Sequence, residues 1–191
     1  MWIFGYGSLI WDPGFTPAEV RRATLAGWRR SFCMRSIHFR GTAEAPGLVL
    51  ALDAAEGAHC TGLALRVAEA EAERVLAETR ARELISDAYL ERRVTLTCER
   101  GEEIPALAYV IDRNGPQYCT VPPEEQARII ATAHGTRGPN TEYLWNTARH
   151  LATLGIADAE LDALSARVRE LTGGGLARDD APPIVARDTN P

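Results

Sequence analysis

The chain has 191 residues, a formal net charge of −5, and 46% hydrophobic and 25% charged residues. These values indicate one globular domain with a sizeable core. The negative charge gives no electrostatic reason to bind nucleic acid or an anionic membrane, and no apolar stretch reaches the roughly 18 residues of a membrane span. No signal-peptide pattern precedes the first apolar segment, so we expect a cytoplasmic protein.

The first part of the chain is rich in short apolar runs that predict β-strands. They cover residues 2–5, 28–37, 47–52, 61–67, 89–98 and 105–111. One amphipathic helix, residues 69–84, interrupts them. Because closing a sheet removes its edge strands, this pattern predicts an α+β fold: a small closed β-barrel of about six strands with flanking helices.

The last third of the chain is predicted to be helical. Helices are expected at 124–133 after two prolines, at 141–154 with Asn140 or Thr141 as the N-cap, and at 158–171. Residues 1–172 are therefore predicted to form one domain. Residues 173–191 are rich in Gly, Pro and Asp and lack periodicity, which predicts a flexible C-terminal tail.

Glu83 lies on the apolar stripe of the first predicted helix. The stripe runs at spacings of three and four through Ala72, Val75, Leu76 and Thr79, and the next position is 83. A Glu that faces a core needs a partner or a raised pKa, and a raised pKa suits a general base near neutral pH. The alternative is an ordinary Glu at a helix end, exposed to water or paired with Arg82 or Arg92.

The N-terminal segment contains two closely spaced glycines after a short strand. Gly5 and Gly7 permit dihedral angles or close approaches that other residues do not, and Ser8 adds a hydroxyl. A turn of this kind can direct several backbone N–H groups at one anion. Standard phosphate loops are excluded, because position 10 is Ile rather than Gly and the chain contains no lysine. The alternative is a tight turn between two core segments.

Neither the cysteines nor the histidines have the spacing of a metal site. They are Cys33, Cys60, Cys98 and Cys119, and His38, His59, His134 and His150. His59 and Cys60 are adjacent in a predicted strand and would point to opposite faces, which argues against a catalytic pair. We therefore expect no metal and no cofactor, and we expect free thiols.

Five segments, in this order and at these distances, carry a resemblance to a known family. They are Phe4-Gly-Tyr-Gly-Ser-Leu-Ile-Trp11, Gly27-Trp-Arg-Arg-Ser-Phe-Cys-Met-Arg35, residues 40–52, Arg82-Glu83 followed by Tyr89, and Gly138-Pro-Asn-Thr-Glu-Tyr-Leu144. From Trp2 to about Leu171 the sequence resembles the ChaC-type γ-glutamylcyclotransferases, the glutathione-degrading branch of the γ-glutamylcyclotransferase superfamily. One departure is the turn after the glutamate, which often carries glycine in that family and here reads Leu84-Ile-Ser-Asp-Ala88.

The resemblance implies a small β-barrel and a ring-closing reaction. The α-amine of a γ-glutamyl group attacks its own γ-amide carbonyl, which forms 5-oxoproline and releases the amine portion, Cys-Gly when the substrate is glutathione. It further implies that Glu83 is the general base and then the general acid. The implied substrate-binding residues are Ile3, Phe4, Gly5, Tyr6, Gly7, Ser8 and Leu9.

Arg40 and Tyr143 are additional candidate contacts, with a structural salt bridge and a packed helical tyrosine as their alternatives. Two other functions stay open. One is a cyclotransferase for other γ-glutamyl amines or amino acids, and the other is a non-catalytic protein that binds γ-glutamyl peptides. In each case the expected partner is a small molecule.

Overall fold

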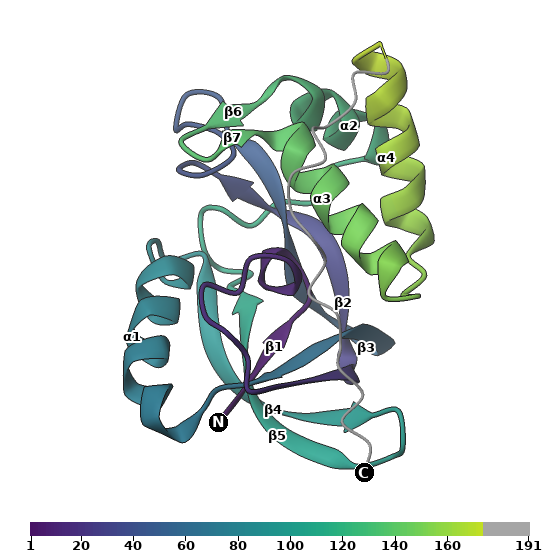
Figure 1. Cartoon of the computed structure of the whole chain (residues 1–191). Coiled ribbons are helices and arrows are strands. Elements are labelled where there is room, and N and C mark those ends of the chain that lie inside the picture. The colour runs from purple at the N-terminus through teal and green to yellow at the C-terminus, as the bar shows by residue number, and fades with distance from the viewer. Residues whose placement is uncertain (174–191) are drawn as a thin grey trace.

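The structure is a computed structural model that describes residues 1–173. Five strands form a closed barrel in the order β1-β3-β2-β4-β5 (Figure 1). Their bounds are β1 Trp2–Gly5, β2 Glu19–Ser36, β3 Gly47–Arg66, β4 Tyr89–Cys98 and β5 Glu103–Ile111. Strands adjacent in this order pair antiparallel. The barrel closes where β5 pairs in parallel with β1, at Ile3 and Leu107, and with β3, at Leu52 and Val110. The predicted α+β barrel is confirmed.

The number and length of the strands differ from the prediction. The predicted strands 47–52 and 61–67 are two ends of one strand, β3, and β2 begins nine residues before the predicted position 28. Both strands continue through a bulge, where pairing steps from Trp28↔Ala54 to Ala26↔His59. Gly27 and Gly57 have positive φ angles at this bulge. The glycines mark a bend within paired strands, so the predicted break between residues 52 and 61 was wrong.

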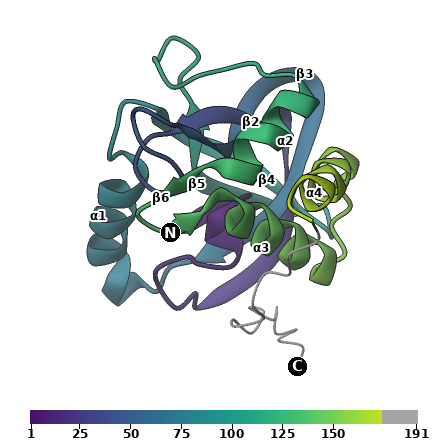
Figure 2. The ribbon, with the colours of Figure 1, turned by 90° about the horizontal axis from the view of Figure 1, so that it is seen from above.

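The helices lie on two sides of the barrel. Helix α1, Ala72–Glu83, follows a 3₁₀ turn at Glu69–Glu71 and stands alone on one side. The other side carries α2, Pro123–Thr132, α3, Asn140–Thr153, and α4, Ala159–Leu171 (Figures 1 and 2). Two short strands, β6 at His134–Gly135 and β7 at Gly138–Pro139, form a hairpin between α2 and α3.

Two hydrophobic clusters account for most of the core. One is contributed by the barrel strands and includes Phe4, Leu25, Leu52, Leu96 and Val110. The other joins β3 to the three C-terminal helices and includes Leu48, Ile130, Leu144, Leu151 and Leu161. The barrel and the helical layer are therefore held together by a continuous apolar surface on β3.

Asn140 has a different role from the predicted helix cap. Its side chain is fully buried and makes no cap hydrogen bond. The Leu48 N–H donates to Asn140 Oδ1 over 2.7 Å, and Asn140 Nδ2 donates to the Leu48 carbonyl over 2.8 Å. Asn140 thus occupies the place of a missing strand neighbour and attaches α3 to β3.

The predicted flexible tail, apart from Gly173, lies outside the described residues. The predicted division at residue 172 stays a prediction. Among the helices within residues 1–173, none has both the length and the apolar character needed to cross a membrane.

Candidate active site

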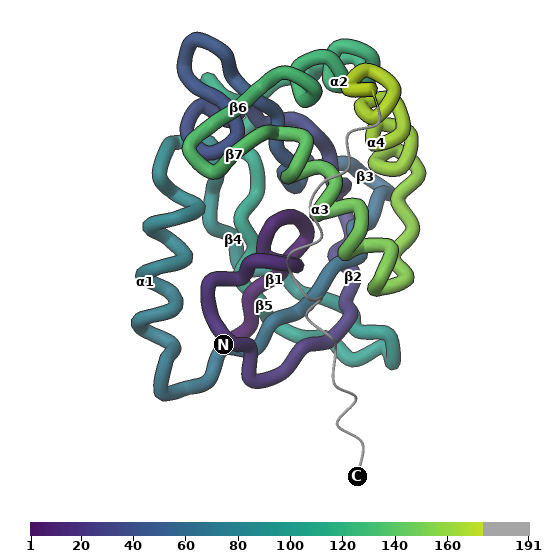
Figure 3. Tube along the Cα trace, turned by 45° about the horizontal axis from the view of Figure 1, so that its top comes forward, coloured from purple at the N-terminus to yellow at the C-terminus, as the bar shows by residue number. Residues whose placement is uncertain are grey.

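A cavity of about 510 Å³ lies where the N-terminal turn, the end of α1 and the start of α3 meet. In Figure 3 the turn after β1 runs between α1 and α3, so three segments far apart in the sequence converge there. The volume is within the range of small-molecule sites. The lining includes Tyr6, Gly7, Ser8, Leu9, Asp12, Leu50, Arg82, Glu83, Tyr89, Tyr109, Arg137 and Tyr143.

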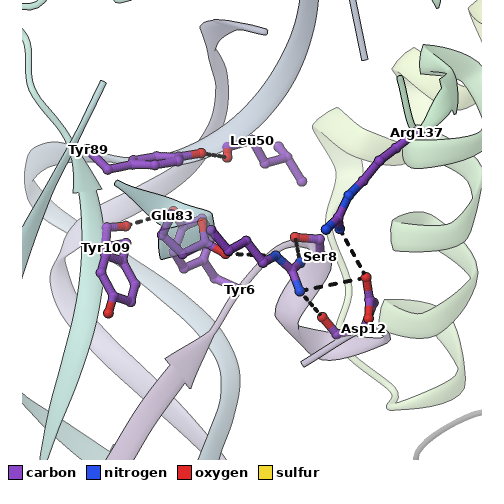
Figure 4. A network of polar contacts seen from close by, with 9 residues as sticks. Tyr6, Ser8, Asp12, Leu50, Glu83, Tyr89, Tyr109 and Arg137 are labelled. Carbon is purple, nitrogen blue, oxygen red and sulfur yellow. Dashed lines mark hydrogen bonds and ion pairs between the residues drawn. The ribbon is translucent and has the colours of Figure 1, made fainter. Parts of the chain in front are cut away.

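Glu83 is the last residue of α1 and lines this cavity (Figure 4). Its side chain is 14% exposed. Burial raises the pKa of the Glu83 carboxyl, and the positive charges of Arg82 and Arg137 oppose that rise. Val75 and Thr79 are buried as the stripe predicts, but at its end the stripe meets the cavity rather than the apolar core. The carboxylate is therefore held near water-accessible space with a raised affinity for a proton.

Arg82 ties Glu83 to the N-terminal turn. Its Nη1 donates to the Asp12 carbonyl over 2.6 Å, and its Nη2 donates to Ser8 Oγ over 2.8 Å. Its Nε lies 3.3 Å from Glu83 Oε1. The pairing with Arg82 that the sequence left as an alternative is therefore present, together with burial. The Arg82 guanidinium therefore sets the position of the Glu83 carboxylate relative to the N-terminal turn.

The turn places three unpaired N–H groups at the cavity. Residues Ser8–Ile10 form one 3₁₀ turn, in which the Gly7 and Ser8 carbonyls accept hydrogen bonds from Ile10 and Trp11. Among the described residues, nothing accepts a hydrogen bond from the N–H of Gly7, Ser8 or Leu9. Such N–H groups at the start of a helical turn are suited to bind an anion.

Gly7 is needed because the Tyr143 hydroxyl lies close to its backbone, and not because of an unusual dihedral angle. Its φ is −131°, outside the left-handed region. A Cβ at this position would lie 3.1 Å from the Tyr143 hydroxyl oxygen. Any side chain at position 7 would therefore press on Tyr143 and narrow the cavity.

Arg30 on β2 supports the turn from outside the cavity lining, and the sequence did not reveal this role. Its side chain is 5% exposed. Nε donates to the Tyr6 carbonyl over 2.6 Å, Nη2 donates to the Thr61 carbonyl over 2.6 Å, and Nη1 pairs with Asp158 at 2.9 Å. Because the C=O and N–H of a trans peptide point in opposite directions, holding the Tyr6 carbonyl turns the Gly7 N–H away from Arg30.

Buried tyrosines form one wall of the cavity. The Tyr6 hydroxyl donates to the Tyr109 carbonyl over 2.7 Å, and the Tyr89 hydroxyl donates to the Leu50 carbonyl over 2.9 Å. The Tyr143 hydroxyl instead accepts from the Leu50 N–H over 3.1 Å, so its own proton is left for another acceptor. Burial raises the pKa of Tyr6, Tyr89 and Tyr143, which keeps all three neutral.

The remaining sequence candidates are divided between the cavity and the core. Ile3 and Phe4 are fully buried in the two hydrophobic clusters, and neither they nor Gly5 line the cavity. Arg40 does line it, with its Nη1 3.0 Å from the Pro139 carbonyl and 3.4 Å from Glu142. The structure thus brings together residues 6–9, Arg40, Glu83 and Tyr143.

We expect activity to survive both metal chelation and brief thiol alkylation. Within residues 1–173 no group of three or more His, Cys, Asp or Glu side chains could hold a metal ion. All four cysteines are buried, and burial raises the pKa of each, to about 12 for Cys33. The check is turnover before and after EDTA or brief iodoacetamide treatment. Complete loss with EDTA, reversed by a divalent ion, would contradict this expectation.

The family model described as ChaC-like protein matches residues 1–171. The chain belongs to this family. It is 38% identical to the glutathione-specific γ-glutamylcyclotransferase of Escherichia coli strain K12, over 90% of this chain and 74% of that protein. It is 33% identical to the glutathione-specific γ-glutamylcyclotransferase of Schizosaccharomyces pombe, over 89% of this chain and 93% of that protein.

Solved structures agree with the fold of this ChaC-like protein. The crystal structure of a glutathione-specific γ-glutamylcyclotransferase from yeast matches with a TM-score of 0.81 at 23% identity, over 89% of this chain and 96% of that one. A structure described as γ-glutamyl cyclotransferase matches with a TM-score of 0.57 at 14% identity, over 92% of this chain and 99% of that one. The family predicted from the five sequence segments is confirmed.

Proposed function

We propose that this ChaC-like protein is a glutathione-specific γ-glutamylcyclotransferase, which converts glutathione to 5-oxoproline and Cys-Gly. The relatives named above support the enzyme class and the substrate. The observation that carries the mechanism is the buried Glu83 carboxylate, tied through Arg82 to the turn with free N–H groups. The proposal places the enzyme in the cytoplasm, with a small molecule as its partner.

In the first step the substrate supplies its own nucleophile. The α-nitrogen of the γ-glutamyl group, once deprotonated, attacks the γ-carbonyl carbon and forms a five-membered ring. Glu83 accepts a proton from this nitrogen. Because the attack is intramolecular, holding the substrate in a folded conformation supplies much of the rate. No serine, cysteine or metal is required as a nucleophile or activator.

In the second step the bond between the γ-carbonyl carbon and the cysteinyl nitrogen breaks. Glu83 returns a proton to the departing nitrogen, so the carboxylate regains its starting charge. Over the whole reaction the α-nitrogen loses two protons and the departing nitrogen gains two. A carboxyl group with a raised pKa is suited to both proton transfers, since it accepts and donates a proton near neutral pH.

The N-terminal turn is proposed to hold negative charge on the γ-glutamyl half. The N–H groups of Gly7, Ser8 and Leu9 are available to the α-carboxylate or to the oxyanion that develops on the γ-carbonyl. The Tyr143 hydroxyl is a further donor on the same side, since Gly7 and Tyr143 are in near contact. These groups are fixed by Arg30, Arg82 and Leu50 before substrate arrives, which lowers the cost of organising the site.

The alternative within the same enzyme class is a cyclotransferase for other γ-glutamyl amines or amino acids. The base and the turn would be the same, and only the pocket for the leaving group would differ. The test compares 5-oxoproline release from glutathione and from γ-Glu-Ala under one condition. We expect glutathione to be the better substrate, with kcat/KM differing by about 10-fold or more, because each lost apolar contact costs about 1–3 kcal/mol. Equal rates would reject glutathione specificity, and binding without turnover would favour the non-catalytic alternative.

A further inference from the structure

Three arginines line the cavity, and they differ in how fully their hydrogen-bond donors are used. All three nitrogens of the Arg82 guanidinium face partners, namely Ser8, Asp12 and Glu83. Arg40 is almost fully buried and holds the Pro139 carbonyl. Arg137 has one long ion pair, 3.4 Å from its Nη1 to Asp12 Oδ2, among the described residues. Arg137 therefore keeps the most donor capacity for a ligand.

The position of Arg137 suits a contact at the mouth of the cavity. Its side chain is 45% exposed, whereas that of Glu83 is 14% exposed. It lies in the β6–β7 hairpin, whose backbone is fixed by hydrogen bonds from Thr136 N–H to the His38 carbonyl and from Arg137 N–H to the Phe39 carbonyl. The guanidinium carbon lies 4.6 Å from the centre of the Phe39 ring. This stacking limits the side chain's freedom and leaves its donor edges available.

We propose that Arg137 binds the terminal carboxylate of the leaving group, which in glutathione is the glycine carboxylate. The inference rests on the function proposed above. Ring closure needs the α-amine and the γ-carbonyl beside Glu83, so the γ-glutamyl half occupies the inner part of the cavity. The rest of the substrate then extends toward the more exposed part of the cavity lining, where Arg137 lies. A guanidinium fork matches a carboxylate in shape and charge.

This assignment makes Arg137 a specificity residue rather than a catalytic one. It distinguishes leaving groups that end in a carboxylate at the length of Cys-Gly from shorter or neutral ones. Asp12 limits the contact, because it accepts from the same guanidinium. We therefore expect Arg137 to contribute moderately to substrate binding, as a hydrogen bond between charged groups does when it is partly exposed to water.

The experiment combines one substitution with one change in the substrate. Arg137→Met removes the guanidinium and keeps an unbranched apolar stem. It is assayed with glutathione and with glutathione esterified at the glycine carboxylate. We expect KM for glutathione to rise about 3- to 10-fold with kcat changed little. We expect the ester to bind wild-type enzyme more weakly than glutathione does, and its KM to be unaffected by the substitution. Arg137→Lys, which keeps the charge without the fork, should fall between wild type and Arg137→Met.

Arg128→Met is the matched control, because Arg128 on α2 is exposed, pairs with Glu124 and does not line the cavity. It should leave KM for both substrates unchanged. Losing the Arg137 charge also raises the Glu83 pKa. That effect is the same for both substrates, so it cancels when the effect of the substitution on glutathione is divided by its effect on the ester.

Equal rises in KM for glutathione and its ester would overturn the inference and indicate that Arg137 contacts the γ-glutamyl half. An unchanged KM for glutathione would overturn it as well. If the wild-type enzyme releases no 5-oxoproline from glutathione, the proposed function fails first, and this inference fails with it.

Discussion

Glu83→Gln is expected to lower kcat by about 100- to 10,000-fold, the usual contribution of a positioned general base. Glutamine keeps the size of the side chain and one oxygen that can face Arg82 at the position of Oε1. It cannot accept and return the proton that the reaction moves. The measurement is 5-oxoproline release at saturating glutathione. A variant that keeps more than a third of wild-type activity would show that Glu83 is not the base.

The same substitution should not destabilise the fold at neutral pH. Burial raises the folded-state pKa of Glu83 above its unfolded value, so the folded state binds the proton more tightly. Between the unfolded-state and the folded-state pKa of Glu83, the free energy of unfolding decreases as pH rises, because the carboxyl ionises more readily in the unfolded state. Above the folded-state pKa this destabilisation reaches its full size. Gln carries no such cost. We expect an equal or higher Tm for Glu83→Gln at pH 7, and no gain near pH 4, below the ordinary Glu pKa.

The pH dependence of activity gives an independent measurement of the same group. Since the ionised carboxylate is the base, kcat/KM should fall as pH drops through the raised pKa of Glu83, at a higher pH than an ordinary glutamate would cause. The residual activity of Glu83→Gln should lack this acid limb. Glu73→Gln is the control on the same helix, because Glu73 is exposed and outside the cavity. It should retain wild-type rates and the wild-type acid limb.

N-acetylglutathione is expected to give no detectable 5-oxoproline. Acetylation turns the α-amine into an amide, whose nitrogen lone pair is delocalised and no longer nucleophilic. The site offers no substitute, since all four cysteines are buried with raised pKa values and the cavity tyrosines stay neutral. Acetylation therefore removes the nucleophile itself rather than weakening binding, so a high substrate concentration should not restore activity.

An α-linked Glu-Cys-Gly peptide is the matched control substrate. It keeps the free amine and the same composition, but attack on its carbonyl would form a three-membered ring, so it should be inert as well. Glutathione measured in parallel must be active. Release of 5-oxoproline from the acetylated compound would reject intramolecular amine attack.

Local patterns in the sequence were sufficient for the family, most elements and the candidate base. The apolar run at residues 89–98 and the apolar stripe up to Glu83 are local patterns, and they appear in the structure as a strand and a helix. They missed the strand residues 19–27 and 53–60, which belong to β2 and β3. Gly27 and Gly57 have the positive φ angles typical of turns, yet they lie in a bulge between paired strands. The choice between turn and bulge depends on the partner strand, which a local pattern does not contain.

Only the tertiary structure decided which residues surround Glu83. Tyr109 and Arg137 carry no local signal that separates them from other tyrosines and arginines, and Arg30 lies 24 residues from the carbonyl that it holds. Asn140 has the form of a helix cap but bonds to Leu48, 92 residues away. Closing the barrel and packing α3 against β3 brings these groups together. A sequence pattern records what a residue does for its own element, whereas a site is defined by contacts between elements, and those depend on how the whole chain packs.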